Sequence, residues 1–258
     1  MPTVNLTQNL REEYQNLFDT CEIKTEKLNE IENIITRIVN NQNKYETVSD
    51  ELNIPWFFIA AIHNMESSLN FNCHLHNGDP LTSRTTHVPA GRPLEGNPPF
   101  TWEQSADDSL TLQRLNQWND WSLPGILYKI EEYNGWGYRR SHPEVLSPYL
   151  WSCSNNYTSG KYVADGRWSD TAVSNQIGAA VILRRMAEKQ LISFDGDTVP
   201  KKPFVYYSSR RIEYGEQLQQ FLNQFPGVRV LVDGAPGQKT SDAFKLVTGN
   251  YLSGDPRA

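Results

Sequence analysis

Apolar residues recur at intervals of three and four positions along much of the chain, and this spacing predicts a mainly helical protein. Within the first 52 residues, the spacing forms one apolar helix stripe made of Leu28, Ile31, Ile34, Ile35, Ile38 and Val39. A further helix is predicted from Pro55 to about Ser68, because proline suits the first helical position and the following residues are largely apolar. Such apolar density indicates a helix buried in the core.

More helices are predicted downstream. The Thr-x-x-Gln pattern at 101–104 is typical of a capping box and predicts a helix that begins there. Helices are also predicted at about 123–133 and at 170–190, the latter with an acidic start and a basic end that suit the helix dipole. After a linker-like stretch at 193–203, the tail predicts two shorter helices at 216–225 and 238–249.

Two long polar segments separate these helices. Residues 70–99 are rich in Asn, Gly, Pro, Thr and His, with one short β-compatible stretch at about 84–88, and residues 134–169 are rich in Gly, Tyr and Ser. Long turn-rich segments inside a compact domain are often functional. All seven Trp lie between Trp56 and Trp168, which is the part of the chain that contains both segments.

Charge and composition narrow the function classes. The chain has 258 residues with 24 Lys+Arg and 30 Asp+Glu, a net charge of −6, and no cluster of cations, so we expect no nucleic-acid partner. Three cysteines, Cys21, Cys73 and Cys153, do not suit a disulfide scaffold. The first residues lack the pattern of a signal peptide and no apolar run could span a bilayer, so we expect synthesis in the cytoplasm without a Sec signal and no membrane insertion.

Glu66 is the leading candidate for chemistry, because it ends the apolar helix immediately before the polar loop. A carboxyl group buried beside apolar side chains resists ionisation, which suits a general acid at neutral pH. Asp79 follows thirteen residues later in a polar setting, with Thr82 close behind. Such a second carboxylate could act as base or stabiliser in cleavage of a sugar chain, although a turn-forming Asp before Pro80 is an equally good interpretation.

Two segments resemble a known family. HNMESSLNF, which contains Glu66, resembles the Glu-Ser-Ser motif of the lysozyme superfamily, particularly lytic transglycosylases, goose-type lysozymes and phage muramidases. EEYNGWGY resembles the Tyr-Asn-Gly segment of the same families. The similarity covers about residues 45–190, and it implies a lysozyme-like α+β domain, mainly α, with a small β-hairpin at the cleft. It also implies that Glu66 is the acid and that Tyr133 and Asn134 lie beside the scissile sugar.

The tail resembles a second family, the small helical peptidoglycan-binding modules. The residues that carry this likeness are Leu218, Gln219, Val232, Asp233, Gly234, Gly237, Thr240 and Ala243. Pro236 stands where such modules often have an aromatic residue. The acidic charge and helix stripe of the first residues predict an acidic helical hairpin at 1–44 that packs on the next segment, and the composition of 193–203 predicts a linker. The two resemblances imply a lysozyme-like catalytic domain at 45–192 and a peptidoglycan-binding-like module at 204–258.

We therefore expect a monomeric muramidase of the endolysin type that cleaves the β-1,4 bonds of peptidoglycan without metal or cofactor. It would act on the cell wall after release or export by a non-Sec route. Its catalytic residues would be Glu66, Asp79 and Thr82. Its substrate-binding residues would be His63, Ser67, His76, Tyr133, Asn134, Tyr149, Trp151 and Tyr162, and some of the Trp rings would face sugar.

Other functions remain open at this point. Lytic transglycosylases and goose-type enzymes usually carry a Gly-x-Met-Gln segment after the Glu, which is absent here and whose absence favours hydrolysis by water. The same fold could instead cleave chitin or chitosan, or bind cell wall without cleaving it. A zinc-dependent amidase using Cys73, His74 and His76, with His63 and His87 nearby in sequence, is less favoured because no HExxH or paired CxxC motif is present.

Overall fold

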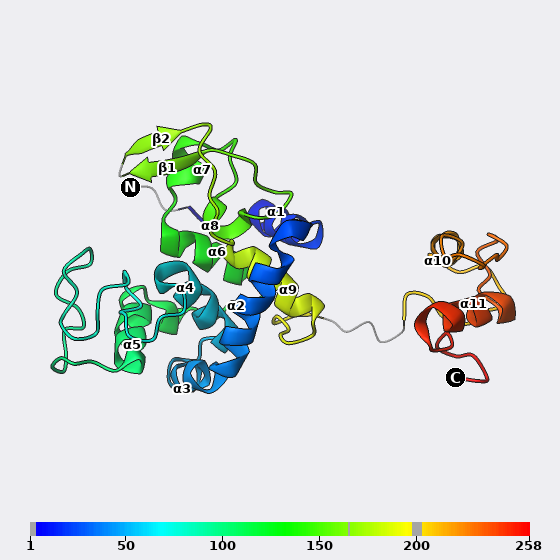
Figure 1. Ribbon diagram of the computed structural model, residues 1–258, viewed down its shortest axis with the longest axis horizontal. Helices are drawn as coiled ribbons and strands as arrows, with labels where there is room; N and C mark the ends of the chain where they lie inside the picture. The colour runs from blue at the N-terminus through cyan, green and yellow to red at the C-terminus, as the bar shows by residue number, and fades with distance from the viewer. Residues whose placement is uncertain (1–3, 165, 198–202) are drawn as a thin grey trace. The chain divides into compact units, whose positions relative to one another are not determined.

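The computed structural model describes residues 4–164, 166–197 and 203–258. The chain divides into two compact units, Met1–Asp197 and Thr198–Ala258 (Figure 1). The predicted linker at 193–203 includes this division, and its residues 198–202 lie outside the described part of the chain. None of the helices built from described residues is long and apolar enough to cross a membrane.

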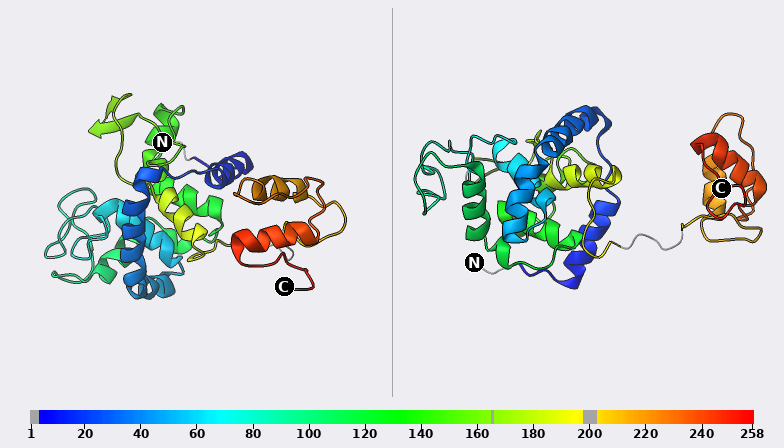
Figure 2. Two further views of the ribbon diagram at one scale, coloured as in Figure 1. Left: turned by 45° about the vertical axis from the view of Figure 1, so that its right-hand side comes forward. Right: turned by 90° about the horizontal axis from the view of Figure 1, so that it is seen from below.

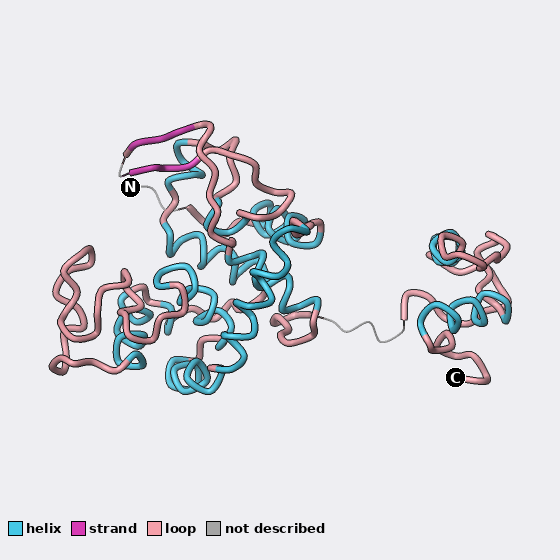
Figure 3. Tube along the Cα trace, in the orientation of Figure 1, coloured by secondary structure: helices cyan, strands magenta, loops and turns pink. Residues whose placement is uncertain are grey.

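The first unit is mainly helical, with one two-stranded antiparallel sheet among its described residues (Figure 3). Its helices are α1 (Gln8–Asp19), α2 (Leu28–Asn40), α3 (Gln42–Leu52), α4 (Trp56–Ser67), α5 (Trp102–Leu112), α6 (Leu123–Asn134), α7 (Gly137–Ser141), α8 (Pro148–Trp151) and α9 (Ala179–Glu188). Two short 3-10 turns, η1 (Thr25–Lys27) and η2 (Leu115–Gln117), connect some of them.

Helix α4 forms the centre of this unit. Its residues 57–65 are all buried, with Phe58, Ile59 and Ile62 fully enclosed. A helix that is apolar on every side needs neighbours on every side, and α3, α6 and α9 pack against it (Figure 2). The predicted helix from Pro55 to Ser68 is thus confirmed, with Pro55 as the residue before the first turn.

The described residues of 1–44, predicted to form an acidic helical hairpin that packs on the next segment, belong to the first compact unit. Helix α1 packs against α6, and α2 packs against α9. The buried side chains Tyr14, Ile31 and Ile38 belong to the same core cluster as α4. Apolar side chains from 1–44 therefore help to enclose the centre of the unit, and 44–45 is not a boundary in the structure.

The β-structure lies in a different place from the predicted strand at 84–88. Strands β1 (Lys161–Ala164) and β2 (Arg167–Ser169) form the hairpin, with Lys161 opposite Ser169 and Tyr162 opposite Trp168. Residues 84–88 form bends and loop, because side chains rather than a strand ladder satisfy much of their backbone.

The predicted helix at 170–190 begins nine residues later, at Ala179. The preceding segment is extended and passes beside α8, where Ser152 Oγ donates to Ser174 O (2.7 Å) and Gly178 N donates to Ser152 O (3.0 Å). Because its backbone groups are used in these contacts, the segment does not need helical hydrogen bonds. A Cβ on Gly178 would lie only 2.2 Å from Leu150 O, so glycine is required for this close approach.

The second unit is small and contains α10 (Gly215–Leu222) and α11 (Gln238–Thr248) around a core of Leu222, Val228 and Ala243. The buried Gln219 amide joins its parts. Gln219 Nε2 donates to Asp233 Oδ1 (2.7 Å), and Gln219 Oε1 accepts from Gly234 N (2.7 Å). A buried amide that is fully hydrogen-bonded fixes the loop between the two helices on α10.

The Gly178 contact gives a test of the fold. Gly178→Ala should lower the free energy of unfolding of the first unit by about 3 kcal/mol, because the added methyl group meets backbone atoms that cannot move independently. Urea unfolding followed by Trp fluorescence measures this unit alone, since all seven Trp lie at 56–168. Gly137→Ala is the matched control and should change stability by less than about 1 kcal/mol, because its Cβ would lie 3.5 Å from the Tyr162 ring. Equal stability of the two variants would contradict the packing described.

Candidate active site

Glu66 lies in the last turn of α4, where the buried helix ends, and it remains partly exposed. The turn that follows is held by Arg37, whose guanidinium donates to Ser68 O (3.0 Å) and Leu69 O (3.3 Å). Burial raises the pKa of Glu66 to about 7, and a hydrogen bond from Tyr149 acts in the opposite direction. Near neutral pH this carboxyl group therefore exists in both protonated and ionised forms.

Two partly buried tyrosines lie near this carboxyl group, and one of them is hydrogen-bonded to it. The Tyr149 hydroxyl, on α8, donates to Glu66 Oε1 at 2.7 Å. The Tyr133 hydroxyl, at the end of α6, contacts Ser109 Oγ at 2.7 Å and Leu75 O at 3.3 Å. Burial and the charge of Glu66 raise the pKa of both phenols, so both keep their protons and act as hydrogen-bond donors at physiological pH.

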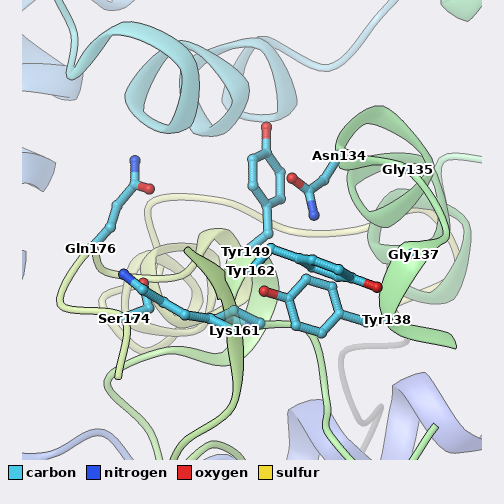
Figure 4. Close-up of a pocket in the computed structure, with 10 residues that line it drawn as sticks. Asn134, Gly135, Gly137, Tyr138, Tyr149, Lys161, Tyr162, Ser174 and Gln176 are labelled. Atoms are coloured by element: carbon cyan, nitrogen blue, oxygen red, sulfur yellow. The ribbon is translucent and has the colours of Figure 1, made fainter. Parts of the chain in front are cut away.

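A polar cavity of about 410 Å³ opens beside Tyr149. It is lined by Asn134, Gly135, Gly137, Tyr138, Pro148, Tyr149, Lys161, Tyr162, Ser174 and Gln176. Figure 4 shows Lys161, Ser174 and Gln176 on one side of the cavity and Asn134 and Tyr138 on the other. The end of α6, α7, α8, strand β1 and the extended segment before α9 all contribute, so the cavity is assembled from parts of the chain that are distant in sequence.

A second cavity of about 570 Å³ shares one wall with the first. It is lined by Glu30, Asn33, Ile34, Arg37, Asn64, Ser68, Asn175, Gln176 and Ile177. Gln176 lines both cavities, and its Nε2 donates to Met65 O at 2.9 Å. The two cavities therefore flank the contact between the extended segment and the end of α4, the turn that contains Glu66.

Asp79 is in the opposite electrostatic environment. Its carboxylate accepts hydrogen bonds from Thr86 N (2.7 Å), His87 N (2.9 Å) and His87 Nδ1 (2.6 Å). These bonds, led by the one from the His87 backbone, hold the pKa of Asp79 well below its usual range. Asp79 is therefore ionised and fixes the turn at 85–92. The residue before it, Gly78, packs on α4, where its Cβ position is 3.2 Å from Glu66 O.

The structure does not join Thr82 to these two carboxyl groups. Thr82 is exposed. Among the hydrogen bonds of the described residues, none connects Thr82 to Glu66 or Asp79, and none connects Glu66 to Asp79 directly. Of the three predicted catalytic residues, Glu66 is the one that is hydrogen-bonded to a residue of the first cavity, namely Tyr149.

Two predicted substrate-binding residues are buried in the core and cannot contact a ligand. His63 is fully enclosed, with Nδ1 3.0 Å from the Tyr45 hydroxyl and the ring packed on Phe71 and Trp102. Burial lowers the pKa of His63 to about 4, so the ring is neutral. Trp151 is 1% exposed.

Two others are used in protein contacts. His76 Nε2 lies 2.7 Å from Asp108 Oδ2, the oxygen that also accepts from Arg92 Nε (2.9 Å). Ser67 Oγ donates to His63 O (3.3 Å) within α4. Of the remaining predicted residues, Asn134, Tyr149 and Tyr162 line the first cavity. Tyr133 is not among its lining residues, and its hydroxyl contacts Ser109 Oγ.

Of the histidines proposed as zinc ligands, His74 and His76 lie close together, with ring centroids 5.8 Å apart, but their nitrogens contact protein groups. His74 contacts Ser105 Oγ (2.8 Å) and Ser83 O (2.8 Å), and His87 contacts Asp79. In the ranges 4–164, 166–197 and 203–258, no three His, Cys, Asp or Glu side chains gather as a group that could hold a metal.

Sequence reasoning missed three polar residues of the first cavity: Lys161, Ser174 and Gln176. The predicted helix at 170–190 includes Ser174 and Gln176, whereas α9 begins at Ala179 and both residues lie in the extended segment before it. The available signal for Lys161 was its place in a long Tyr-rich and Gly-rich segment, which indicated function in general and no particular side chain.

Comparisons of the chain with protein-family models, curated proteins and solved structures give no significant match. The resemblance to the lysozyme superfamily therefore remains a hypothesis based on the segments around Glu66 and Tyr133. Any function has to be argued from the geometry and electrostatics of the site.

The raised pKa of Glu66 predicts a pH-dependent stability. Between pH 4.5 and 7 the unfolded chain has released this proton while the folded chain keeps it, so wild-type stability falls as the pH rises through this window. Glu66→Gln removes this contribution, and its stability relative to wild type should rise by about 2–3 kcal/mol between pH 4.5 and pH 8. Urea unfolding followed by Trp fluorescence at each pH measures the difference. The exposed Glu12→Gln is the control, and a Glu66→Gln curve parallel to wild type would show that Glu66 titrates normally.

Proposed function

We propose that this protein is a glycoside hydrolase that cleaves the β-1,4 bonds of peptidoglycan, with Glu66 as its general acid. One observation carries the proposal. A partly exposed carboxyl group, with its pKa raised to about 7 by burial, lies at the end of a core helix and contacts a tyrosine that lines a polar cavity. Perturbed carboxyl groups next to cavities are typical of acid–base catalysis.

The chemistry of such an acid fits glycoside cleavage. Glu66 holds its proton in a large fraction of molecules near pH 7, so it can protonate the oxygen of the leaving sugar as the glycosidic bond breaks. The carboxylate that remains is stabilised by the hydrogen bond from Tyr149 at 2.7 Å. Glu66 can then take a proton back from the attacking water.

The cavities suit a sugar chain. Tyr138, Tyr149 and Tyr162 present aromatic surface, while Asn134, Ser174 and Gln176 offer amide and hydroxyl groups. Sugar rings have both apolar faces and polar edges, and they bind to such mixtures. The second cavity, on the other side of Gln176, provides room for further sugar units and favours a polymer over a single sugar.

The proposed fold is lysozyme-like. Three features support it: a buried helix that ends in Glu66, the Tyr133–Asn134 pair at the end of α6, and a two-stranded hairpin beside the cavity. The hairpin is formed by β1 and β2, so the segment with Asp79 is not its equivalent.

Asp79 is proposed as the ionised partner of Glu66. The environments of the two carboxyl groups shift their pKa values in opposite directions, which is the pattern expected of an acid and a carboxylate that stays charged. The packing of Gly78 on the end of α4 supports a location of this loop beside the site. Thr82, on the exposed side of the same loop, keeps its predicted role in positioning substrate.

The second unit is proposed as a cell-wall-binding module. The residues that carry its resemblance, among them Gln219, Asp233 and Gly234, form the buried network that joins α10 to the following loop. Their main task is therefore to hold the fold of the unit. Any glycan contact has to come from its exposed side chains.

The Glu66→Gln variant tests the enzymatic proposal. It should release reducing ends from purified peptidoglycan about 10³-fold more slowly than wild type, because the amide cannot donate an acidic proton to the glycosidic oxygen. Reducing-sugar release gives the rate, and Trp fluorescence shows whether the fold is intact. Glu12→Gln should keep wild-type activity. Activity of folded Glu66→Gln at the wild-type rate would overturn the assignment.

Tyr149→Phe tests the link between the tyrosine and the acid. Without the hydroxyl the carboxylate loses a hydrogen bond, so the pKa of Glu66 rises further. The pH at which activity declines on the alkaline side should therefore move upward, together with a lower maximal rate. Tyr162→Phe is the control, because Tyr162 lines the same cavity but is not hydrogen-bonded to Glu66. This variant should leave the alkaline limit of activity unchanged. An unchanged limit in Tyr149→Phe would indicate that another group controls it.

A further inference from the structure

The charged groups that line the first cavity are of one sign, positive. Among its described lining residues, Lys161 is the one cation, and no Asp or Glu lines it. The other lining groups that can bond a ligand are hydroxyls and amides from Tyr, Ser, Asn and Gln. Near neutral pH, with Glu66 partly protonated, a ligand in this cavity therefore faces a positive charge at one wall.

Lys161 has no partner within the part of the chain that the structure describes: no ion pair or side-chain hydrogen bond occupies its ammonium group. Other partly buried cations of the same unit are paired, for example Arg139 with Glu131 (2.8 Å) and Lys129 with Glu132 (2.5 Å). Lys161 itself is partly buried. Removing an ammonium group from water without a partner costs free energy, and a bound anion would recover it.

The backbone of Lys161 is held firmly by the hairpin. Lys161 pairs with Ser169, and the adjacent Gly160 N donates to Ala172 O (2.9 Å). The next residue, Tyr162, packs edge-on against Trp168, whose ring stacks on His142 at 3.5 Å. These contacts fix the strand, so the lysine projects from a preformed wall of the cavity.

Lys161 lines the cavity together with two residues of the extended segment that can form hydrogen bonds, Ser174 and Gln176. Figure 4 shows its side chain running toward Ser174, with Gln176 on the same side of the cavity. The backbone of Ser174 is held because its N donates to the Tyr157 hydroxyl (3.2 Å). The Gln176 amide is oriented because Nε2 donates one of its two hydrogens to Met65 O (2.9 Å). An ammonium group beside a hydroxyl and an amide is a suitable environment for one carboxylate.

We propose that this wall is a carboxylate subsite, so that the cavity takes an N-acetylglucosamine-type glycan that carries a carboxylate and discriminates against a neutral one. The proposal rests on the proposed function and specifies its substrate: peptidoglycan, with a lactyl ether or a peptide carboxylate on alternate sugars, in preference to chitin. A neutral glycan would bury the ammonium group without a partner, which is the basis of the selectivity.

Binding measurements on Glu66→Gln, which prevents turnover, test the subsite. The probes are chitotetraose, a peptide-free tetrasaccharide of alternating N-acetylglucosamine and N-acetylmuramic acid, and the same tetrasaccharide with its stem peptides. Calorimetry should show tighter binding of a carboxylate-bearing probe. Adding Lys161→Gln should weaken binding of that probe about tenfold and leave chitotetraose unchanged. A loss that already appears with the peptide-free probe identifies the lactyl carboxylate, and a loss confined to the peptide-bearing probe identifies the peptide.

Arg167→Gln in the Glu66→Gln background is the matched control, because it removes the same charge from the paired strand at an exposed position. It should change neither affinity. Equal losses for charged and neutral probes, or a loss in Arg167→Gln as large as in Lys161→Gln, would overturn the subsite. If wild type cleaves peptidoglycan but Lys161→Gln does not change the affinity for the charged probes, the subsite is refuted and the hydrolase proposal stands. Lys161-dependent selectivity in a protein that cleaves no glycan supports the subsite and refutes the hydrolase.

Discussion

Burial of the Glu66 carboxyl group at the end of α4 is the constraint on which the rest of the site depends. Because α4 is apolar on all sides, the unit encloses it with α3, α6 and α9. The helix then ends where the core meets the polar segments, and it carries Glu66 to that edge with too few polar neighbours to stabilise its charge. The Tyr149 hydroxyl donates a hydrogen bond to it, and Tyr149 also lines the adjacent cavity.

A raised pKa alone would not single out Glu66. Glu131 is also buried, and burial raises its pKa, but Arg139 Nε (2.8 Å) and the Tyr14 hydroxyl (2.6 Å) bind its carboxyl group. Those contacts connect α6 to α1 and α7, which is a structural role. Glu66 differs because no ion pair among residues 4–164, 166–197 and 203–258 involves it, and because its hydrogen-bond donor Tyr149 lines a cavity. Asp79 differs again, because its backbone donors keep it ionised.

Local signals in the sequence predicted the elements whose determinants are local. The capping box is confirmed, with Thr101 Oγ1 accepting from Gln104 N (3.2 Å) and Gln104 Oε1 accepting from Thr101 N (2.9 Å). The apolar run after Pro55 likewise predicted α4, and the position of Glu66 at its end follows from the same pattern. The capping bonds join residues three positions apart, and the apolar run lies within one helix. A single stretch of sequence is therefore sufficient to recognise both elements.

Features that depend on distant contacts could not be predicted in this way. The start of α9 is set by the close approach of Gly178 to Leu150, and the polar environment of Lys161 is completed by Ser174 from another segment. His63 was expected to bind substrate because it is a polar residue close to Glu66 in the sequence. Phe71 and Trp102, which come later in the chain, instead enclose its ring. Helical periodicity gives the buried face of one helix but does not say which side chains from elsewhere cover it.

We propose that Glu66 acts as the general acid in hydrolysis of a glycosidic bond, with water as the second reactant. Digestion of purified peptidoglycan in water enriched in oxygen-18, followed by mass spectrometry of the soluble fragments, tests it most directly. The account predicts fragments with a reducing-end sugar that carries the heavy oxygen at its anomeric position. Anhydro-sugar fragments without the label would instead show a transglycosylase, and label in the carboxylate of freed peptides would show an amidase; either result would contradict the account.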